Sequence, residues 1–290
     1  MSLGDILDGA FKLFKADAAT VIVVTLAFTA PLQLLAAYVQ RDALGVFDAL
    51  LDPQSAAFVD PATVGGDPLP SLVATLITML VLPFVAGAVA RIVGDSYLGR
   101  PTGAGVALRA AGRRWWSLLA GWFLVHVVEG IPVLFAGALA AVGVATSLVP
   151  LIVLGVLAVL GALLAGVFIM PLFVAVAPII VMEDIGAVAA MRRSYRLLRP
   201  RYGPVLGIAL LTGILSSLLG SALGTVPMIG AFLLGSAGWP LLAVGGLLAN
   251  LVVVPIVAIV STLIYFDGRI RQEGFDLQVM AAELAGARAS

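Results

Sequence analysis

Long apolar segments alternate with short polar segments along the whole chain. A hydrocarbon core of ~30 Å requires ~20 apolar residues from each helix that crosses it. Segments of that kind lie at about residues 20–40, 71–93, 116–146, 149–182, 204–225 and 240–266. The pattern predicts an all-α fold: a polytopic membrane bundle of six transmembrane helices. We expect residues 1–290 to form a single membrane domain that ends in a short polar tail at 267–290.

The number of crossings depends on the middle of the chain. Residues 115–182 contain only two ionisable side chains, His126 and Glu129, and their length fits two long spans or three short ones. Three spans would place the basic segment Arg192–Arg201 outside, against the tendency of basic loops to stay in the cytoplasm. We therefore expect two spans, divided near Ser147.

Basic residues gather between the apolar segments. All of the 16 Lys and Arg residues except Arg41 lie in four clusters: Lys12–Lys15, Arg91–Arg114, Arg192–Arg201 and Arg269–Arg288. The positive-inside rule places such clusters in the cytoplasm. The expected location is therefore a bacterial cytoplasmic (inner) membrane, crossed many times, with both termini in the cytoplasm.

Two segments are expected on the outer side. Residues 41–70 are polar, with Asp-Pro turn signals, and they predict a solvated loop. Residues 226–239 carry no charge, so we expect this connection to lie in the membrane interface or to re-enter the membrane.

A short amphipathic segment with a basic residue precedes each odd-numbered span. The aligned segments are 10–21, 107–118 and 194–205, with Lys12, Arg109 and Arg196 at the shared third position. They predict three short cytoplasmic helices that lie in the membrane interface, each followed by a helix hairpin, at a spacing of roughly 90 residues. Common ancestry of the three units and convergence on a basic helix before a span are both open.

The amino-acid composition argues against a soluble protein and against several classes of enzyme. The chain is 62% hydrophobic and 11% charged, whereas soluble proteins average ~25% charged residues. It has no cysteine and one histidine. A glycine-rich phosphate loop, a serine nucleophile elbow and a zinc helix motif are all missing from the sequence. We expect no enzyme, no metal, no cofactor and, without a soluble basic face, no nucleic-acid partner.

His126 and Glu129 form the sharpest candidate site. Spaced by three residues, they share one helical face near the middle of the third span. A charge at that depth costs ~3 kcal/mol or more, so such groups usually face a cavity or a partner. A proton-relay or ligand site is one interpretation. The other is a neutral Glu129 hydrogen-bonded to His126 or to carbonyls freed by Pro132.

The basic clusters suggest a second kind of site. Besides fixing topology, Lys and Arg near the membrane surface attract anionic lipid headgroups, at ~1 kcal/mol per residue. The residues expected at this interface are Lys12, Lys15, Arg109, Arg113, Arg114, Arg192, Arg193, Arg196, Arg199 and Arg201.

Three segments resemble a known group of bacterial membrane proteins. They read SLGDILDGAFKLFK, EDIGAVAAMRRSYRLLRPRYGPVLG and YFDGRIRQEGFDLQVMA, and the similarity is strongest at 183–207 and 265–280. They resemble the family named for the membrane domain of glycerophosphoryl diester phosphodiesterases. The resemblance implies a helical membrane domain that occurs both fused to a catalytic barrel and alone. With one histidine and no room for a barrel, this chain is similar to the standalone form, so no phosphodiesterase activity is expected.

Two functions follow from these patterns, and a third, an intramembrane enzyme, ranks below both. The first is a non-enzymatic membrane scaffold or lipid- and partner-binding module, whose partners are membrane lipids and either another membrane protein or a second copy. The alternative is a transporter or lipid translocator with a polar site at His126 and Glu129. Proline recurs in the spans, and interrupted helices build transporter sites. These prolines are Pro31, Pro83, Pro132, Pro171, Pro178, Pro227 and Pro255.

Overall fold

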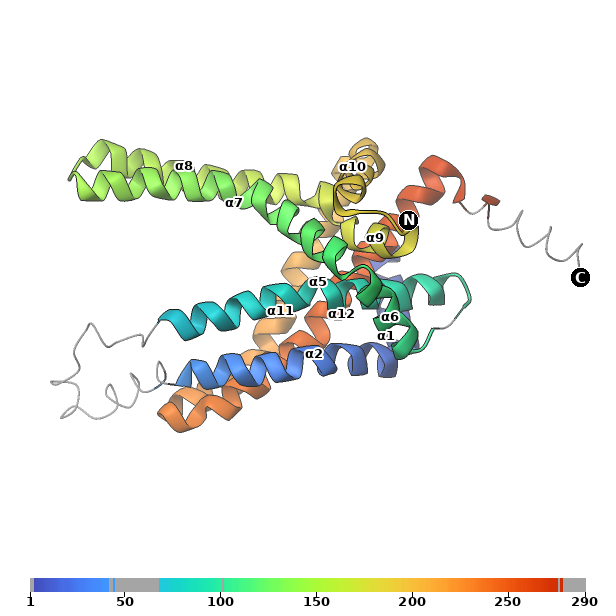
Figure 1. The fold of residues 1–290 in the computed structure, drawn as a ribbon, viewed down its shortest axis with the longest axis horizontal. Coiled ribbons are helices and arrows are strands. Elements are labelled where there is room, and N and C mark those ends of the chain that lie inside the picture. Colours follow the sequence, from blue (N-terminus) through green and yellow to red (C-terminus); the bar gives the residue numbers. More distant parts are fainter. Residues whose placement is uncertain (1–2, 42–43, 45–67, 101, 276, 279–290) are drawn as a thin grey trace, which may run out of the picture. The chain divides into compact units, whose positions relative to one another are not determined.

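Helices make up the regular structure of the chain. The computed structural model describes residues 3–41, 44, 68–100, 102–275 and 277–278, and in these ranges there is no strand (Figure 1). Six of the helices are long and apolar enough to cross a membrane. The predicted all-α fold with six candidate spans is therefore confirmed, and the chain is a multi-pass membrane protein. The expected outer loop falls mostly outside the described residues.

The element order repeats three times, as the sequence predicted. Each repeat starts with a short helix and continues with two long ones. The short helices are α1 (Leu3–Ala16), α6 (Ala104–Arg113) and α10 (Ala187–Leu198), and the long ones are α2 (Ala18–Val39), α5 (Pro68–Tyr97), α7 (Trp115–Ala145), α8 (Val149–Ile169), α11 (Tyr202–Leu233) and α12 (Trp239–Glu273). Each short helix has a basic residue in its last turn, namely Lys15, Arg113 or Arg196. A cation there is favourable because the carbonyl end of a helix is partly negative.

The chain divides into two compact units. One contains residues 1–7, 114–210 and 261–290, and the other contains residues 8–113 and 211–260. Helices α11 and α12 each contribute to both units. A single membrane domain stays a prediction, and each unit is described below by itself.

In the first unit, α7 and α8 form a tight antiparallel hairpin. Its turn lies at Ser147, which has a positive φ of 55°, close to the expected division. A Cβ atom on Gly155 would collide with the backbone of Ala140, and one on Gly143 would collide with the backbone of Ile152. Glycine at these positions therefore lets the two backbones approach closely, which is how helices pack in lipid.

The fourth span, expected at 149–182, matches the candidate span Val149–Glu183, and its helix is interrupted. After α8 comes a 3-10 turn, η1 (Met170–Phe173), and then α9 (Val176–Glu183). Pro171 has no backbone N–H and its ring crowds the preceding turn, which breaks an α-helix. Two carbonyls of the break are satisfied from outside the segment, because Ser194 Oγ donates to the Leu172 carbonyl at 2.7 Å and Tyr202 Oη to that of Phe168 at 2.8 Å.

In the second unit, α11 is longer than the fifth span predicted. It continues through Pro227 to Leu233, and a short 3-10 turn, η3 (Gly235–Gly238), joins it to α12. The connection between the two helices is therefore shorter than the expected segment 226–239, and its place at the membrane interface stays a prediction. Gly245 of α12 lies against Gly224 and Pro227 of α11, so packing in an antiparallel pair supports the helix beyond the proline.

The second unit also contains a core between α2 and α5. The rings of Phe28 and Phe84 meet edge to face, with centroids 4.8 Å apart. Near the end of α5, the Arg91 guanidinium lies 2.8 Å from the carboxylate of Asp95, which also accepts a hydrogen bond from Thr102. This helix extends to Tyr97, so its charged end is helical rather than a loop.

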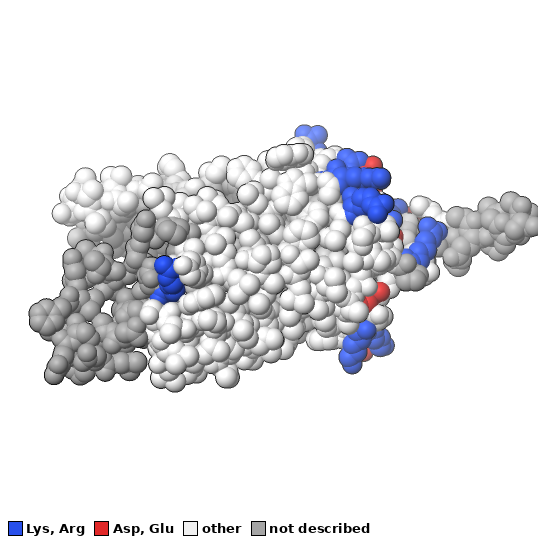
Figure 2. Space-filling view, turned by 60° about the horizontal axis from the view of Figure 1, so that its bottom comes forward, with Lys and Arg blue, Asp and Glu red and all other residues white. Residues whose placement is uncertain are grey.

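Apolar side chains lie on the outer surface, as expected in lipid. Leu134 and Phe135 of α7 are 74% and 76% exposed, and Leu157 of α8 is 60% exposed. Figure 2 shows charged side chains in separate groups beside a broad surface that carries none. Water would disfavour such a surface, whereas lipid tails match it.

The α7–α8 hairpin gives a test with a matched control on one helix. Gly155→Ala should destabilise the protein by about 1–3 kcal/mol, because the added methyl group overpacks the seam. Gly161→Ala should be neutral or stabilising, because a Cβ at that position has open space and alanine favours helix. Thermal unfolding in detergent, followed by circular dichroism, measures both. Equal stability of the two variants would contradict the close approach.

Candidate functional site

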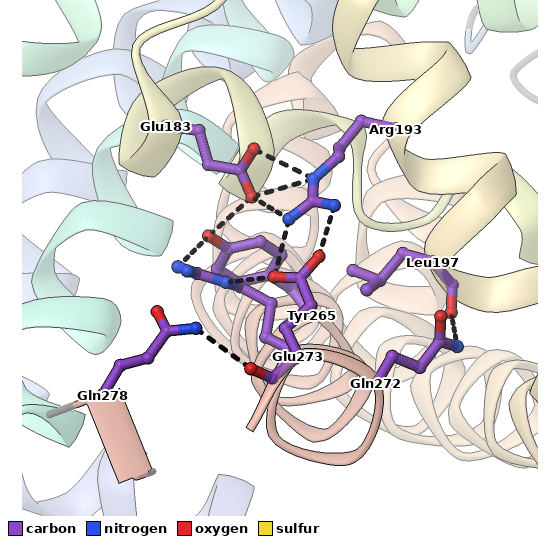
Figure 3. Close-up of polar contacts among 8 residues, drawn as sticks. Glu183, Arg193, Leu197, Tyr265, Gln272, Glu273 and Gln278 are labelled. Atoms are coloured by element: carbon purple, nitrogen blue, oxygen red, sulfur yellow. Dashed lines mark hydrogen bonds and ion pairs between the residues drawn. The ribbon is translucent and has the colours of Figure 1, made fainter. Parts of the chain in front are cut away.

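The most densely connected polar residues of the first unit form a closed ring. Its members are Glu183 at the end of α9, Arg193 on α10, and Tyr265, Arg269 and Glu273 on α12 (Figure 3). The Arg193 guanidinium bonds Glu183 through Nε at 3.1 Å and Nη2 at 3.2 Å, and it also pairs with the Glu273 carboxylate.

Tyr265 and Arg269 complete the ring. The Tyr265 hydroxyl donates to Glu183 Oε1 at 3.1 Å, and Arg269 Nη1 donates to the same hydroxyl at 3.1 Å. Arg269 Nε then donates to Glu273 Oε2 at 3.1 Å. Two guanidinium groups thus face two carboxylates around a fully buried tyrosine ring, so the charges cancel locally. This arrangement fastens three helices, and its polar groups are engaged with one another.

Further polar contacts join the same helix ends. Arg114, just before α7, pairs with Asp184, and its Nη2 donates to the Asp184 carbonyl at 2.6 Å. The hydrogen bond to Asp184 raises the pKa of the Arg114 guanidinium above its ordinary value. Arg201, just before α11, pairs with Asp267 of α12. The starts of α7 and α11 therefore lie beside the ends of α9 and α12. The charge pattern predicts this arrangement, because it places the basic segments before the third and fifth spans on the same side of the membrane.

The local backbone explains why these partners meet. Asp184 takes a left-handed conformation, with φ of 58°, and this ends α9 directly after Glu183. The chain then starts α10, whose buried face includes Ala190 and Ser194. Gln272 of α12 donates to the carbonyl of Leu197 near the other end of α10. Backbone reversal and these hydrogen bonds bring Arg193 to the carboxylates.

The ten basic residues expected at lipid headgroups fall into two classes. Arg114, Arg193 and Arg201 are partly buried and have acidic partners, so their charges are already paired within the protein. The other seven are exposed and form no ion pair with the described part of the chain. They are Lys12, Lys15, Arg109, Arg113, Arg192, Arg196 and Arg199.

The structure does not join His126 to Glu129. The exposed His126 ring stacks on Trp122, with centroids 3.9 Å apart, and its Nδ1 lies 2.8 Å from the Trp122 carbonyl oxygen. Glu129 instead packs against Gly166 of α8. It borders a small cavity of about 40 Å³ together with Pro132, which has room for water. Among the described residues, no group of three His, Asp or Glu side chains could hold a metal.

A polar pocket in the second unit was missed by sequence reasoning. It has a volume of about 450 Å³, and four of its lining residues have polar side chains, namely Gln33, Gln40, Ser221 and Thr225. Glycines of α11 and α12 form much of the remaining wall. The sequence offered two signals, an isolated Gln33 in a span and a small-residue spacing along α11, but only the fold shows that they meet.

Comparison with known proteins gives the chain a family. Residues 1–267 match the family described as a domain of unknown function (DUF7847). The chain belongs to this family. No curated protein and no solved structure matches it. Membership in DUF7847 assigns no activity, and the resemblance to the phosphodiesterase membrane domain stays an expectation. The two segments that carry this resemblance most strongly, 183–207 and 265–280, supply all five members of the ring.

The ring predicts that neighbouring arginines on α10 differ in their effect on stability. Arg193→Gln leaves two partly buried carboxylates without their shared cation. The expected loss is about 2 kcal/mol, between that of an exposed and a fully buried ion pair. Arg192→Gln changes an exposed side chain and should stay within about 0.5 kcal/mol of the native protein. Chemical or thermal unfolding in detergent compares them, and an equal effect of both substitutions would show that the ring does not hold the helices.

Proposed function

We propose that this DUF7847 protein is a non-enzymatic module of a bacterial cytoplasmic membrane that binds anionic lipid headgroups. Both termini and the three short helices lie in the cytoplasm in this proposal, because the positive-inside rule places the basic clusters there. The observation that carries it is the set of seven exposed Lys and Arg residues that form no ion pair with an acidic side chain in the described part of the chain. These cations are available to phosphates outside the protein.

The arginines of α10 differ in their partners. This difference supports lipid binding over a role that is limited to fixing the orientation of the helices in the membrane. Arg193 of α10 is held by Glu183 and Glu273, while Arg192 and Arg196 of the same helix are exposed. The anchored residue fixes the helix, and the exposed ones face outward from it. Each exposed basic residue near an anionic surface contributes ~1 kcal/mol of attraction, so several together give a substantial preference for anionic lipid.

A scaffold role in the same membrane is compatible with this proposal. Most of the long helices are apolar over their full length, and little of the described chain extends beyond them. The proposal therefore includes assembly with another membrane protein or a second copy, through the lipid-facing helices or the basic face. The non-enzymatic character rests on the polar groups of the ring, which are occupied by one another.

Transport or lipid translocation is a second candidate, and one observation favours it. Glu129, an ionisable residue in the third candidate span, borders a cavity beside the proline of α7. Intramembrane carboxylates at cavities often carry protons or ligands. The small volume of about 40 Å³ favours bound water over a passage, so this function ranks behind lipid binding.

Lipid analysis separates the two candidates. We expect the full-length protein, purified in mild detergent, to retain anionic phospholipids in excess of their share of the source membrane, as measured by mass spectrometry. This excess should fall at an ionic strength of about 1 M, where charges are screened beyond ~3 Å.

Glu129→Gln provides the control for this experiment. The retained lipid should be unchanged in this variant if the basic residues bind it, and should drop if Glu129 belongs to the lipid site. Retention of lipids in the same proportions as the source membrane would contradict the proposed function.

A further inference from the structure

An open groove runs along the outer face of α10. Its volume is about 660 Å³, and six residues line it: Phe173 of η1, and Val188, Met191, Arg192, Tyr195 and Arg196 of α10. The five α10 residues are spaced by three or four, so they share one face of the helix. Val188 is 53% exposed, although it is apolar. The groove thus combines an apolar floor with two guanidinium groups and no carboxylate.

The opposite face of α10 is fixed in the first unit. Ala190, Ser194 and Leu197 are buried there, and Ser194 Oγ donates to the Leu172 carbonyl in the adjoining break. Arg193 holds the helix from the side through Glu183 and Glu273. Because these contacts set the rotation of α10 about its axis, the groove face points away from the protein core.

We infer that this groove binds one anionic phospholipid. Arg192 and Arg196 are one helical turn apart on one face, and guanidinium groups form paired hydrogen bonds with phosphate oxygens. An acyl chain fits the apolar side chains of Phe173, Val188 and Met191. Tyr195 lies between the two arginines on the same face, and tyrosine is enriched where a membrane surface meets water.

The observations favour a lipid over other occupants. A free phosphate would use the guanidinium groups but leave the apolar floor exposed to water. A partner protein helix would bury the floor but would need carboxylates opposite the two arginines. A phospholipid satisfies both halves at once, and the groove lies on the helix that opens the candidate span Ala187–Leu233. This inference rests on the proposed function and narrows it to one site.

Native mass spectrometry of the full-length protein in detergent, titrated with phosphatidylglycerol, tests this site. The double variant R192Q/R196Q should bind the first lipid about 30-fold more weakly, since each basic residue is worth about fivefold. Val188→Trp should also lose this lipid, because it fills the apolar floor without changing charge. Excess inorganic phosphate should not displace the lipid from the native protein.

Helix α6 supplies matched controls. R109Q/R113Q removes two exposed arginines, and Val106→Trp alters a valine that is also 53% exposed. Both should retain the first phosphatidylglycerol. If the control and groove variants lose lipid equally, or if Val188→Trp keeps it, the groove is not the site although lipid binding itself stands. Displacement by inorganic phosphate would overturn the acyl-chain contact. If the native protein prefers phosphatidylglycerol no more than phosphatidylcholine, the proposed function fails as well.

Discussion

Hydrocarbon cannot solvate a charge, and this constraint orders the whole molecule. A lone ion in a membrane must either move to a surface or find an opposite charge. In the first unit the second solution is visible in the ring of Glu183, Arg193, Tyr265, Arg269 and Glu273, where each ion meets an opposite ion and a buried hydroxyl links them. The long helices of this unit can then be largely apolar between their ends, where charged side chains meet in pairs.

Because of the same constraint, the arginine residues of this protein fall into two groups with different partners. Arg193 and Arg201 are tied to carboxylates on other helices, so they hold the ends of α9, α10 and α12 together. Arg192 and Arg196, on the same short helix as Arg193, have no acidic partner in the described chain. In our proposal the first group builds a rigid platform, and the second presents charge from that platform to lipid phosphates.

Long apolar segments made the fold predictable, because length and hydropathy alone identify a membrane span. Local breaks were harder, since proline has no single outcome in a membrane helix. At Pro171 the helix breaks, and hydroxyl groups from α10 and α11 satisfy two carbonyls there. At Pro227 the helix continues, supported by Gly224 and Gly245. The sequence shows both prolines, but it does not show which residues pack beside them and decide between these outcomes.

The candidate sites were less predictable for the same reason. The spacing of His126 and Glu129 places them on one helical face. In the structure, however, the His126 ring stacks on Trp122 and the Glu129 side chain packs against Gly166. The pair Arg193 and Glu273 is separated by 80 residues, and a single sequence gives no sign that they meet. The sequence identifies the basic residues, but only the structure separates those with acidic partners from those that form no ion pair within the described residues.

The most direct test of this account concerns the side of the membrane on which the short helices lie. The native chain has no cysteine, so single cysteines report position without background. With a membrane-impermeant maleimide applied to intact cells, Ser147→Cys in the α7–α8 turn should be labelled at once. Arg196→Cys on α10 should be labelled only after the membrane is opened. The opposite pattern, or labelling of both in intact cells, would contradict the six crossings and the cytoplasmic basic face.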